Sequence, residues 1–231
     1  MRAGPVVPRR TTIIGPGAPR PGVRDFRYAA SMRISIVGAG YVGLVTAACL
    51  AHVGHDVVCI DVDAARIEHL REGRLPVHEP GLDELVAEGL ESGRLAFATE
   101  YAATRDSELI VVCVGTLDAD EEWNGEIVRA AVRDIAADAD LPRRIVIRST
   151  LLPGTARAIA AAVADIDSDV VLAHNPEFTR EASAVSDFLD PDRVVIGVDG
   201  HDDGAEGSAL AESLRKLYAP LEARVIVTDL T

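Results

Sequence analysis

The fold is decided by Arg33-Ile-Ser-Ile-Val-Gly-Ala-Gly-Tyr-Val-Gly43 and by the residues that follow it as far as Asp61. The first five residues predict a short buried strand, and three glycines come next at the spacing G-x-G-x-x-G. Residues 41–53 are mostly small and apolar and predict a helix, while residues 56–60 predict a second strand that ends at Asp61. Strand, glycine turn, helix, strand and acid are together the fingerprint of a dinucleotide-binding unit.

Each part of this fingerprint has a physical role. Gly38 permits the tight turn, Gly40 lets a pyrophosphate approach the backbone because it has no Cβ, and Gly43 lets the helix pack closely on the strand. The helix N-terminus offers N–H groups and a partial positive charge to the phosphates. Asp61, about 20 residues downstream, can accept hydrogen bonds from both ribose hydroxyls. We therefore predict a dinucleotide cofactor; the alternative is a glycine-rich turn that binds nothing.

The acid at position 61 favours NAD over NADP, because a carboxylate repels a 2′-phosphate. Arg66 leaves an alternative open, since its guanidinium could bind that phosphate or stack on adenine. We favour the adenine contact, and with it NAD.

Composition limits the class of protein. The chain has 231 residues, enough for one large domain or two small ones, and its hydrophobic content of 48% supports a substantial core. No apolar run approaches the roughly 20 residues of a membrane span. The net charge of −14 argues against a nucleic-acid surface. We predict neither a membrane nor a nucleic-acid partner.

Acidic residues cluster in segments 118–122 and 199–203. One interpretation is an ordinary solvated surface encoded by a GC-rich genome. The interpretation that we favour is adaptation to high salt, in which carboxylates keep the surface hydrated.

Cys49, Cys59 and Cys113 all lie in apolar runs and predict small buried side chains. Neither a metal-binding spacing nor a disulfide framework is visible, so we predict no metal site. Reduced cysteines suit a reducing compartment, and we predict a cytoplasmic protein. Cys113 ends a predicted strand near the cofactor, but its apolar surroundings argue against a nucleophile.

Residues 1–31 differ from the rest, because they are rich in Pro, Gly and Arg and contain one acid, Asp25. A basic targeting arm is one interpretation. We favour a disordered leader or a wrongly assigned start, since such a composition cannot bury a core. Met32 immediately precedes the first strand.

Predicted helices and strands alternate after Asp61. Helices are expected at 64–71, 82–90, 127–137, from 155 onward and at 205–218, and strands at 94–98, 108–114, 144–148, 170–173, 193–198 and 224–227. The interiors of these strands are apolar, as in a parallel sheet that is covered on both faces. We predict a doubly wound parallel α/β fold, with a Rossmann-like NAD-binding domain over residues 32–227.

Ligands of an open parallel sheet bind at the carboxyl ends of the strands. The segments that follow strands here are 38–43, 61, 114–117, 149–151 and 174–183, and we expect them to converge on one cleft. Ser149 and Thr150 offer hydroxyls there for a water or a nicotinamide ribose; helix capping is the alternative.

Segment 174–183 carries candidates for acid/base chemistry. Glu177 and Glu181 are four residues apart, and two carboxylates beside a cofactor could transfer protons. From spacing alone, a solvated turn is favoured. His174 has no partner at metal spacing, and we interpret it as a hydrogen-bonding loop residue.

Six short motifs carry a resemblance to a known family. They are Gly38-Ala-Gly-Tyr-Val-Gly-Leu44, Glu79-Pro-Gly-Leu82, Cys113-Val-Gly-Thr116, Arg148-Ser-Thr150 with Pro153-Gly-Thr155, Asn175-Pro-Glu-Phe178 with Arg180-Glu181, and Pro191-Asp-Arg-Val194. From Met32 onward the chain resembles the UDP-glucose 6-dehydrogenases, within the wider UDP-glucose/GDP-mannose dehydrogenase group. The Asn-Pro-Glu-Phe and Arg-Ser-Thr motifs are specific to that group.

The resemblance implies an NAD-dependent oxidoreductase of nucleotide-sugar metabolism, of the kind that serves polysaccharide biosynthesis. The C6 alcohol of UDP-glucose would become an aldehyde and then a carboxylate, with two hydrides passed to two NAD molecules. A cysteine would capture the aldehyde, and the resulting thioester would be hydrolysed.

The resemblance also implies roles for individual residues. Thr150 would help to hold the water, and Glu177 would act in general acid/base catalysis. The residues expected to contact the cofactor are Gly38, Gly40, Tyr41, Val42, Gly43, Asp61, Arg66, Thr116, Ser149, Thr150 and Glu181. The residues expected to line the sugar site are Glu177, Phe178, Thr179, Arg180 and Glu181.

The chain departs from the family pattern at Leu117, Thr179 and Ala182, where the family usually has Pro, Leu and Gly. The family also continues into a long connecting helix, through which it dimerises, and a second domain with the nucleophilic cysteine. We interpret residues 228–231 as the start of that helix, and the chain as the NAD-binding half of such an enzyme. A homodimer is expected if the connecting helix is present.

Two alternatives remain from the sequence. The chain could be a stand-alone or decayed NAD-binding module without full activity. It could also belong to a sister dehydrogenase acting on UDP-N-acetyl-mannosamine or GDP-mannose, because the contacts that select the sugar and the base lie largely in the absent half.

Overall fold

The computed structural model describes residues 31–117, 120–138, 140–199 and 205–230. The predicted leader lies outside these residues except for Ser31, as do Asp118, Asp202 and Asp203 of the acidic segments and Thr231 at the end of the chain.

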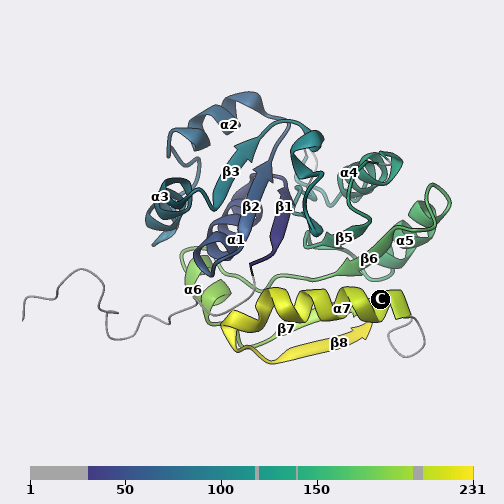
Figure 1. The fold of residues 1–231 in the computed structure, drawn as a ribbon. Helices are drawn as coiled ribbons and strands as arrows, with labels where there is room; N and C mark the ends of the chain where they lie inside the picture. The colour runs from purple at the N-terminus through teal and green to yellow at the C-terminus, as the bar shows by residue number, and fades with distance from the viewer. Residues whose placement is uncertain (1–30, 118–119, 139, 200–204, 231) are drawn as a thin grey trace, which may run out of the picture.

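Eight strands form one sheet in the order β3-β2-β1-β4-β5-β6-β7-β8 (Figure 1). The strands are β1 (Arg33–Val37), β2 (Asp56–Ile60), β3 (Leu95–Ala98), β4 (Leu109–Val112), β5 (Arg144–Ile147), β6 (Val171–His174), β7 (Val194–Val198) and β8 (Val225–Asp229). The helices are α1 (Tyr41–His52), α2 (Ala64–Arg71), α3 (Leu82–Ser92), α4 (Glu126–Ala137), α5 (Thr155–Ala164), α6 (Ala184–Leu189) and α7 (Ala205–Tyr218), with 3-10 turns η1 (Tyr101–Thr104) and η2 (Ala219–Leu221).

The first six strands are all parallel, which confirms the predicted doubly wound α/β fold. The chain runs outward from β1 through β2 to β3, and then returns to pair β4 with the other side of β1. The strand order therefore reverses between β1 and β4, where such sheets open a crevice at their carboxyl ends. The glycine turn follows β1 at this reversal.

Alternate strand residues face two separate cores. In β1, Ile34 and Ile36 belong to the core on the side of α1, α3 and α7, whereas Val37 belongs to the core under α4 and α5. Helix α1 is buried from Gly43 to Ala51, because its small apolar residues lie between the sheet, α3 and α6. Within the described ranges, no helix combines the length and the hydropathy needed to cross a bilayer.

The prediction of an entirely parallel sheet is wrong at β7, which runs antiparallel to β6. To pair parallel to β6, the next strand would need a crossover connection that returns the chain along the full length of the strands. Here the connection contains only the six-residue helix α6, about 9 Å long at 1.5 Å per residue, and α6 packs on α1 at the same end of the sheet. The chain therefore enters β7 from the end at which it left β6. Strand β8 then pairs parallel to β7.

Most predicted element boundaries agree with the structure within two residues, but the end of the chain does not. Strand β8 continues through Asp229, which pairs with Val198, and the N–H of Leu230 donates to the carbonyl of Val198. The helical start expected at 228–231 is therefore wrong for residues 228–230. Helix α6 lies directly after a segment that the sequence predicted only as a polar loop.

Candidate functional site

The glycine turn after β1 fits a bound pyrophosphate. Gly38 has φ +102°, and a Cβ there would lie 2.7 Å from the carbonyl oxygen of Cys113. A Cβ on Gly43 would lie 1.8 Å from the carbonyl oxygen of Gly38, so the helix can approach the strand this closely only with glycine. At Gly40, in contrast, a Cβ would meet no protein atom within 4 Å, which leaves the approach to the backbone open.

Helix α1 begins at this turn with its N-terminus available to an anion. The N-cap Gly40 has no side chain to bond the first-turn N–H groups, and the first turn contains no acidic residue. The N–H groups of Tyr41, Val42 and Gly43 thus belong to the part of a helix that binds phosphate. The structure brings these predicted residues together at the point where the sheet reverses.

Asp61 is held in place by the backbone and by Arg66. Its Oδ2 accepts hydrogen bonds from the N–H of Ala39 at 2.8 Å and from Arg66 Nη1 at 2.9 Å, while its Oδ1 accepts from the N–H of Asp63 at 3.0 Å. The Arg66 guanidinium also lies 3.8 Å from the carboxylate of Asp63. Because two carboxylates already balance the charge of Arg66, the arrangement favours an unphosphorylated ribose, as in NAD.

The segments after β4 and β5 form a second group. The Ser149 hydroxyl is buried and donates to the carbonyl of Val114 at 2.7 Å, which ties the two segments together. Thr150 is exposed, and its carbonyl lies 3.5 Å from the indole nitrogen of Trp123. Helix capping by Ser149 and Thr150 is wrong, because α5 begins at Thr155 with Gly154 as its N-cap. The cofactor contacts of Ser149, Thr150 and the half-buried Thr116 stay predictions.

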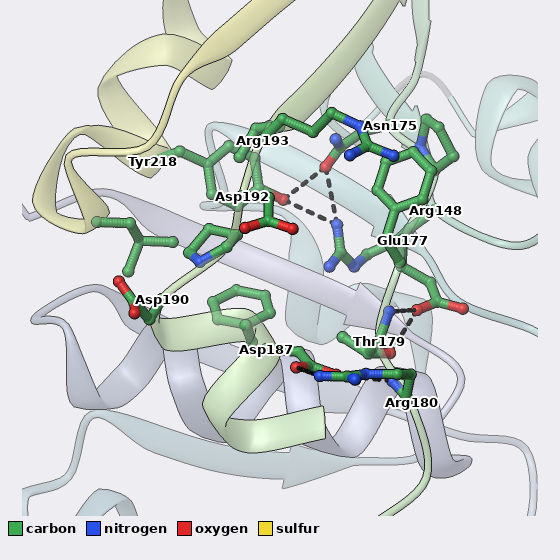
Figure 2. A pocket seen from close by; sticks show the side chains of 16 residues that line it. Arg148, Asn175, Glu177, Thr179, Arg180, Asp187, Asp190, Asp192, Arg193 and Tyr218 are labelled. Atoms are coloured by element: carbon green, nitrogen blue, oxygen red, sulfur yellow. Dashed lines mark hydrogen bonds and ion pairs between the residues drawn. The ribbon is translucent and has the colours of Figure 1, made fainter. Parts of the chain in front are cut away.

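A hollow of about 450 Å³ lies beside the segment after β6 (Figure 2). Four predicted sugar-site residues line it, namely Glu177, Phe178, Thr179 and Arg180. Of the five segments expected to share a cleft, only 174–183 contributes to this hollow, so one common cleft stays a prediction.

Short contacts shape the 177–182 segment. Glu177 Oε2 accepts hydrogen bonds from the backbone N–H of Thr179 at 2.6 Å and from the Thr179 hydroxyl. Figure 2 shows Arg180 lying side by side with Asp187, whose Oδ1 is 2.7 Å from Arg180 Nη2. The bonds from Arg180 hold the pKa of Asp187 well below its ordinary value. The two side chains fix the segment to α6.

Sequence reasoning gave no role to Arg148, which is only 6% exposed. Its guanidinium donates to the Thr46 hydroxyl at 3.1 Å. It also donates to Asn175 Oδ1 at 3.0 Å and to the Tyr218 hydroxyl at 3.2 Å (Figure 2). It also lies 5.3 Å from the ring centroid of Phe188. One side chain thus connects α1, β5, α6, α7 and the start of the 175–183 segment. A charged residue at the end of an apolar strand was the available signal.

Glu79 was likewise missed. It is 1% exposed, in the loop before α3, and it accepts a hydrogen bond from the Tyr41 hydroxyl at 2.5 Å. Burial and this hydrogen bond raise the pKa of Tyr41 to about 12. A glutamate followed by Pro and Gly reads as an exposed loop, so no local pattern predicts its burial.

The three cysteines are free and buried, as predicted. Burial raises the pKa of the Cys113 thiol to about 12, so it is not a nucleophile at neutral pH. His174 is the last residue of β6 rather than a loop residue. Among the described residues its Nε2 has no hydrogen-bond partner, and burial lowers its pKa. That part of the chain also contains no group of three or more His, Cys, Asp or Glu placed to hold a metal ion.

A parallel sheet with the order 3-2-1-4-5-6, a glycine turn at its reversal and an acid after β2 define a dinucleotide-binding Rossmann domain. Comparison with known proteins then identifies the family. The model of the UDP-glucose/GDP-mannose dehydrogenase family, NAD binding domain, matches residues 32–222. The chain belongs to this family, and these residues are its NAD-binding domain.

Similar proteins include UDP-glucose 6-dehydrogenases and GDP-mannose 6-dehydrogenases. UDP-glucose 6-dehydrogenase of Rhizobium meliloti is 40% identical over 205 residues, which cover 87% of this chain and 47% of that protein. GDP-mannose 6-dehydrogenase of Pseudomonas syringae pv. tomato is 38% identical over 213 residues, 86% of this chain and 46% of that protein. The chain thus spans about half the length of these relatives.

Solved structures of family members show the same fold. A ternary complex of GDP-mannose dehydrogenase from Pseudomonas aeruginosa superposes with a TM-score of 0.77 at 33% identity, over 86% of this chain and 46% of that one. UDP-glucose dehydrogenase from Pyrobaculum islandicum gives a TM-score of 0.76 at 36% identity, over 88% of this chain and 47% of that one.

Proposed function

We propose that this chain supplies the NAD-binding half of an enzyme that oxidises UDP-glucose to UDP-glucuronate through two successive hydride transfers. The observation that carries the proposal is the position of two groups at the same end of the sheet. One is the glycine turn with Asp61, and the other is the Glu177 segment with its adjoining hollow. The 40% identity to a UDP-glucose 6-dehydrogenase supports the choice of substrate.

The residues of this chain would divide the work between binding and proton transfer. When bound, NAD supplies the hydride acceptor. The first-turn N–H groups of α1 would hold its pyrophosphate, and Asp61 would hold the adenosine ribose. Exposed Thr150 would hold a water near the reacting carbon.

Glu177 would exchange the protons of the reaction. Thr179 engages Oε2, and within the described residues no hydrogen bond engages Oε1, which leaves that oxygen for a proton. The thioester step of the family needs a reactive thiol. We assign none of the three cysteines here to it, because all are buried.

A GDP-mannose dehydrogenase is the second candidate, favoured by the 38% identity to GDP-mannose 6-dehydrogenase. Thr179 and Ala182 stand where the family usually has Leu and Gly; Thr179 lies in the segment predicted to contact the sugar, and Ala182 directly follows that segment. A stand-alone NAD-binding module is the non-enzymatic alternative.

The proposal is tested by titrating the 231-residue chain with NAD and NADP, and then the NAD complex with UDP-glucose and GDP-mannose. We expect saturable NAD binding, and NADP binding at least about tenfold weaker because of Asp61. A response to UDP-glucose alone would support the proposed substrate, and a preference for GDP-mannose would select the second candidate. NAD binding with no response to either sugar nucleotide is what the NAD-binding half by itself would give, because the contacts that select the sugar and the base lie largely in the other half. No binding of either dinucleotide would overturn the cofactor site.

A further inference from the structure

Glu79 joins two parts of the molecule that are far apart in sequence. A buried carboxylate needs hydrogen-bond donors, because removal from water is costly. Its Oε2 accepts from the Tyr41 hydroxyl at 2.5 Å, and its Oε1 accepts from the backbone N–H of Val185 at 3.4 Å. Since Tyr41 begins α1 and Val185 lies in the first turn of α6, Glu79 links these two helices.

The Tyr41 end of this link lies at the cofactor site. Tyr41 is the first residue of α1, so its own backbone N–H belongs to the helix N-terminus that would hold the pyrophosphate. Its hydroxyl keeps its proton at neutral pH, because its pKa is raised to about 12, and it therefore remains a donor to Glu79. The charge of Glu181 and the backbone of Ala182 also influence this pKa.

The Val185 end of the link lies directly after the predicted sugar segment. Ser183, the N-cap of α6, makes no side-chain capping bond, so Glu79 supplies an acceptor to the first turn of α6. A Cβ on Gly81 would lie 3.7 Å from Val185 Cγ1, which shows that the Glu79 loop packs on α6. Ala182 has φ +65°, a left-handed conformation that a non-glycine residue keeps only when its surroundings hold it.

We propose that Glu79 is a positioning residue that holds segment 177–182 against the first turn of α1, and so makes the order of this segment depend on bound NAD. The inference rests on the proposed function, because NAD is the ligand and the segment carries Glu177 and Glu181. Coupling of this kind is reciprocal: if the tied segment favours NAD binding, bound NAD stabilises the tied segment.

The test is hydrogen–deuterium exchange of the 231-residue chain with and without saturating NAD, together with the NAD dissociation constant. In the unsubstituted chain we expect NAD to slow exchange across residues 177–185 by about fivefold or more, the lower range of such couplings. Tyr41→Phe removes the donor to Glu79. Glu79→Gln keeps the shape but turns one acceptor into an amide donor. In each variant we expect the slowing to fall below about twofold, while NAD still binds saturably.

Tyr101→Phe is the matched control. It removes the hydroxyl of a half-buried tyrosine in η1, which packs against the core under α4 and α5 rather than against α1 and α6. It should leave the NAD-dependent slowing unchanged. In the double variant Tyr41→Phe with Glu79→Gln, the two reductions in NAD-dependent slowing should not add, because both substitutions break the same hydrogen bond between Tyr41 and Glu79.

The outcomes separate this inference from the proposed function. If NAD binds but exchange over residues 177–185 does not respond, or if Glu79→Gln keeps the full response, the positioning role is overturned and the NAD site stands. If Glu79→Gln speeds exchange equally in α4, residues 126–137, the residue supports the fold generally and the proposal fails. If the unsubstituted chain does not bind NAD, both proposals fail.

Discussion

Gly40→Ala and Gly43→Ala should separate cofactor binding from folding. A Cβ at position 40 meets no protein atom within 4 Å, and its φ of −75° suits alanine, so we expect the free energy of unfolding to change by less than about 0.5 kcal/mol. That methyl group would instead occupy the path of the pyrophosphate. Loss of one hydrogen bond to a charged group costs about 1.5–3 kcal/mol, so the NAD dissociation constant should rise by about tenfold or more.

Gly43→Ala should act mainly on the stability of the fold. Its Cβ would lie 1.8 Å from the carbonyl oxygen of Gly38, so α1 must retreat from β1 by roughly 1.5 Å in a close-packed region. We expect a loss of about 3 kcal/mol in the free energy of unfolding. Urea denaturation and calorimetric NAD titration of both variants measure the two effects. NAD binding by Gly40→Ala at the original affinity would refute the argument that the pyrophosphate approaches this backbone.

Three other substitutions test other parts of the site. Ala182→Gly should raise the free energy of unfolding by about 1 kcal/mol in urea denaturation, because Ala182 has φ +65°; a lower value would contradict the left-handed assignment. Asp187→Asn should weaken the acid dependence of stability. Because the pKa of Asp187 is lowered in the folded state, its ionised carboxylate stabilises the fold above the ordinary pKa of ~3.9, and this contribution disappears as pH falls toward the lower folded value. Unfolding curves from neutral to acid pH measure it, and an unchanged slope would count against the Arg180 pair. Tyr218→Phe should cost about 1–3 kcal/mol in thermal or urea unfolding, because Arg148 and Asn175 lose a buried partner; no change would show that the network is not needed for stability.

Local patterns were sufficient for the nucleotide-binding part of the fold. The strand, glycine turn and helix of residues 33–52 are contiguous, and their hydrogen bonds and close approaches follow from residues a few positions apart. The limits of β2, α2 and α7 agree with the prediction for the same reason. The antiparallel β7 escaped prediction because its direction depends on where α6 packs, and α6 has only six residues in which to show a helical pattern.

In the candidate site, too, short motifs pointed to some residues, whereas others are defined by partners that are remote in sequence. Asp61, Arg66 and Glu177 were singled out as candidates from short motifs, and their roles toward the cofactor and the sugar stay predictions. Arg148 and Glu79 were not recognised as connecting residues, because their partners are remote in sequence. Arg148 bonds to Thr46, 102 residues away, and Glu79 bonds to Val185, 106 residues away.

The sequence by itself determined that this chain has a Rossmann NAD-binding unit and that its motifs match the nucleotide-sugar dehydrogenases. Glycine spacing, strand hydrophobicity and a downstream acid act through neighbouring backbone, so they can be interpreted without knowing what packs where. Only the tertiary structure decided the direction of β7, the burial of Arg148 and Glu79, and the link from Tyr41 to α6. Those features depend on desolvation and on partners across the fold, because a charged side chain is buried only where distant residues supply its hydrogen bonds.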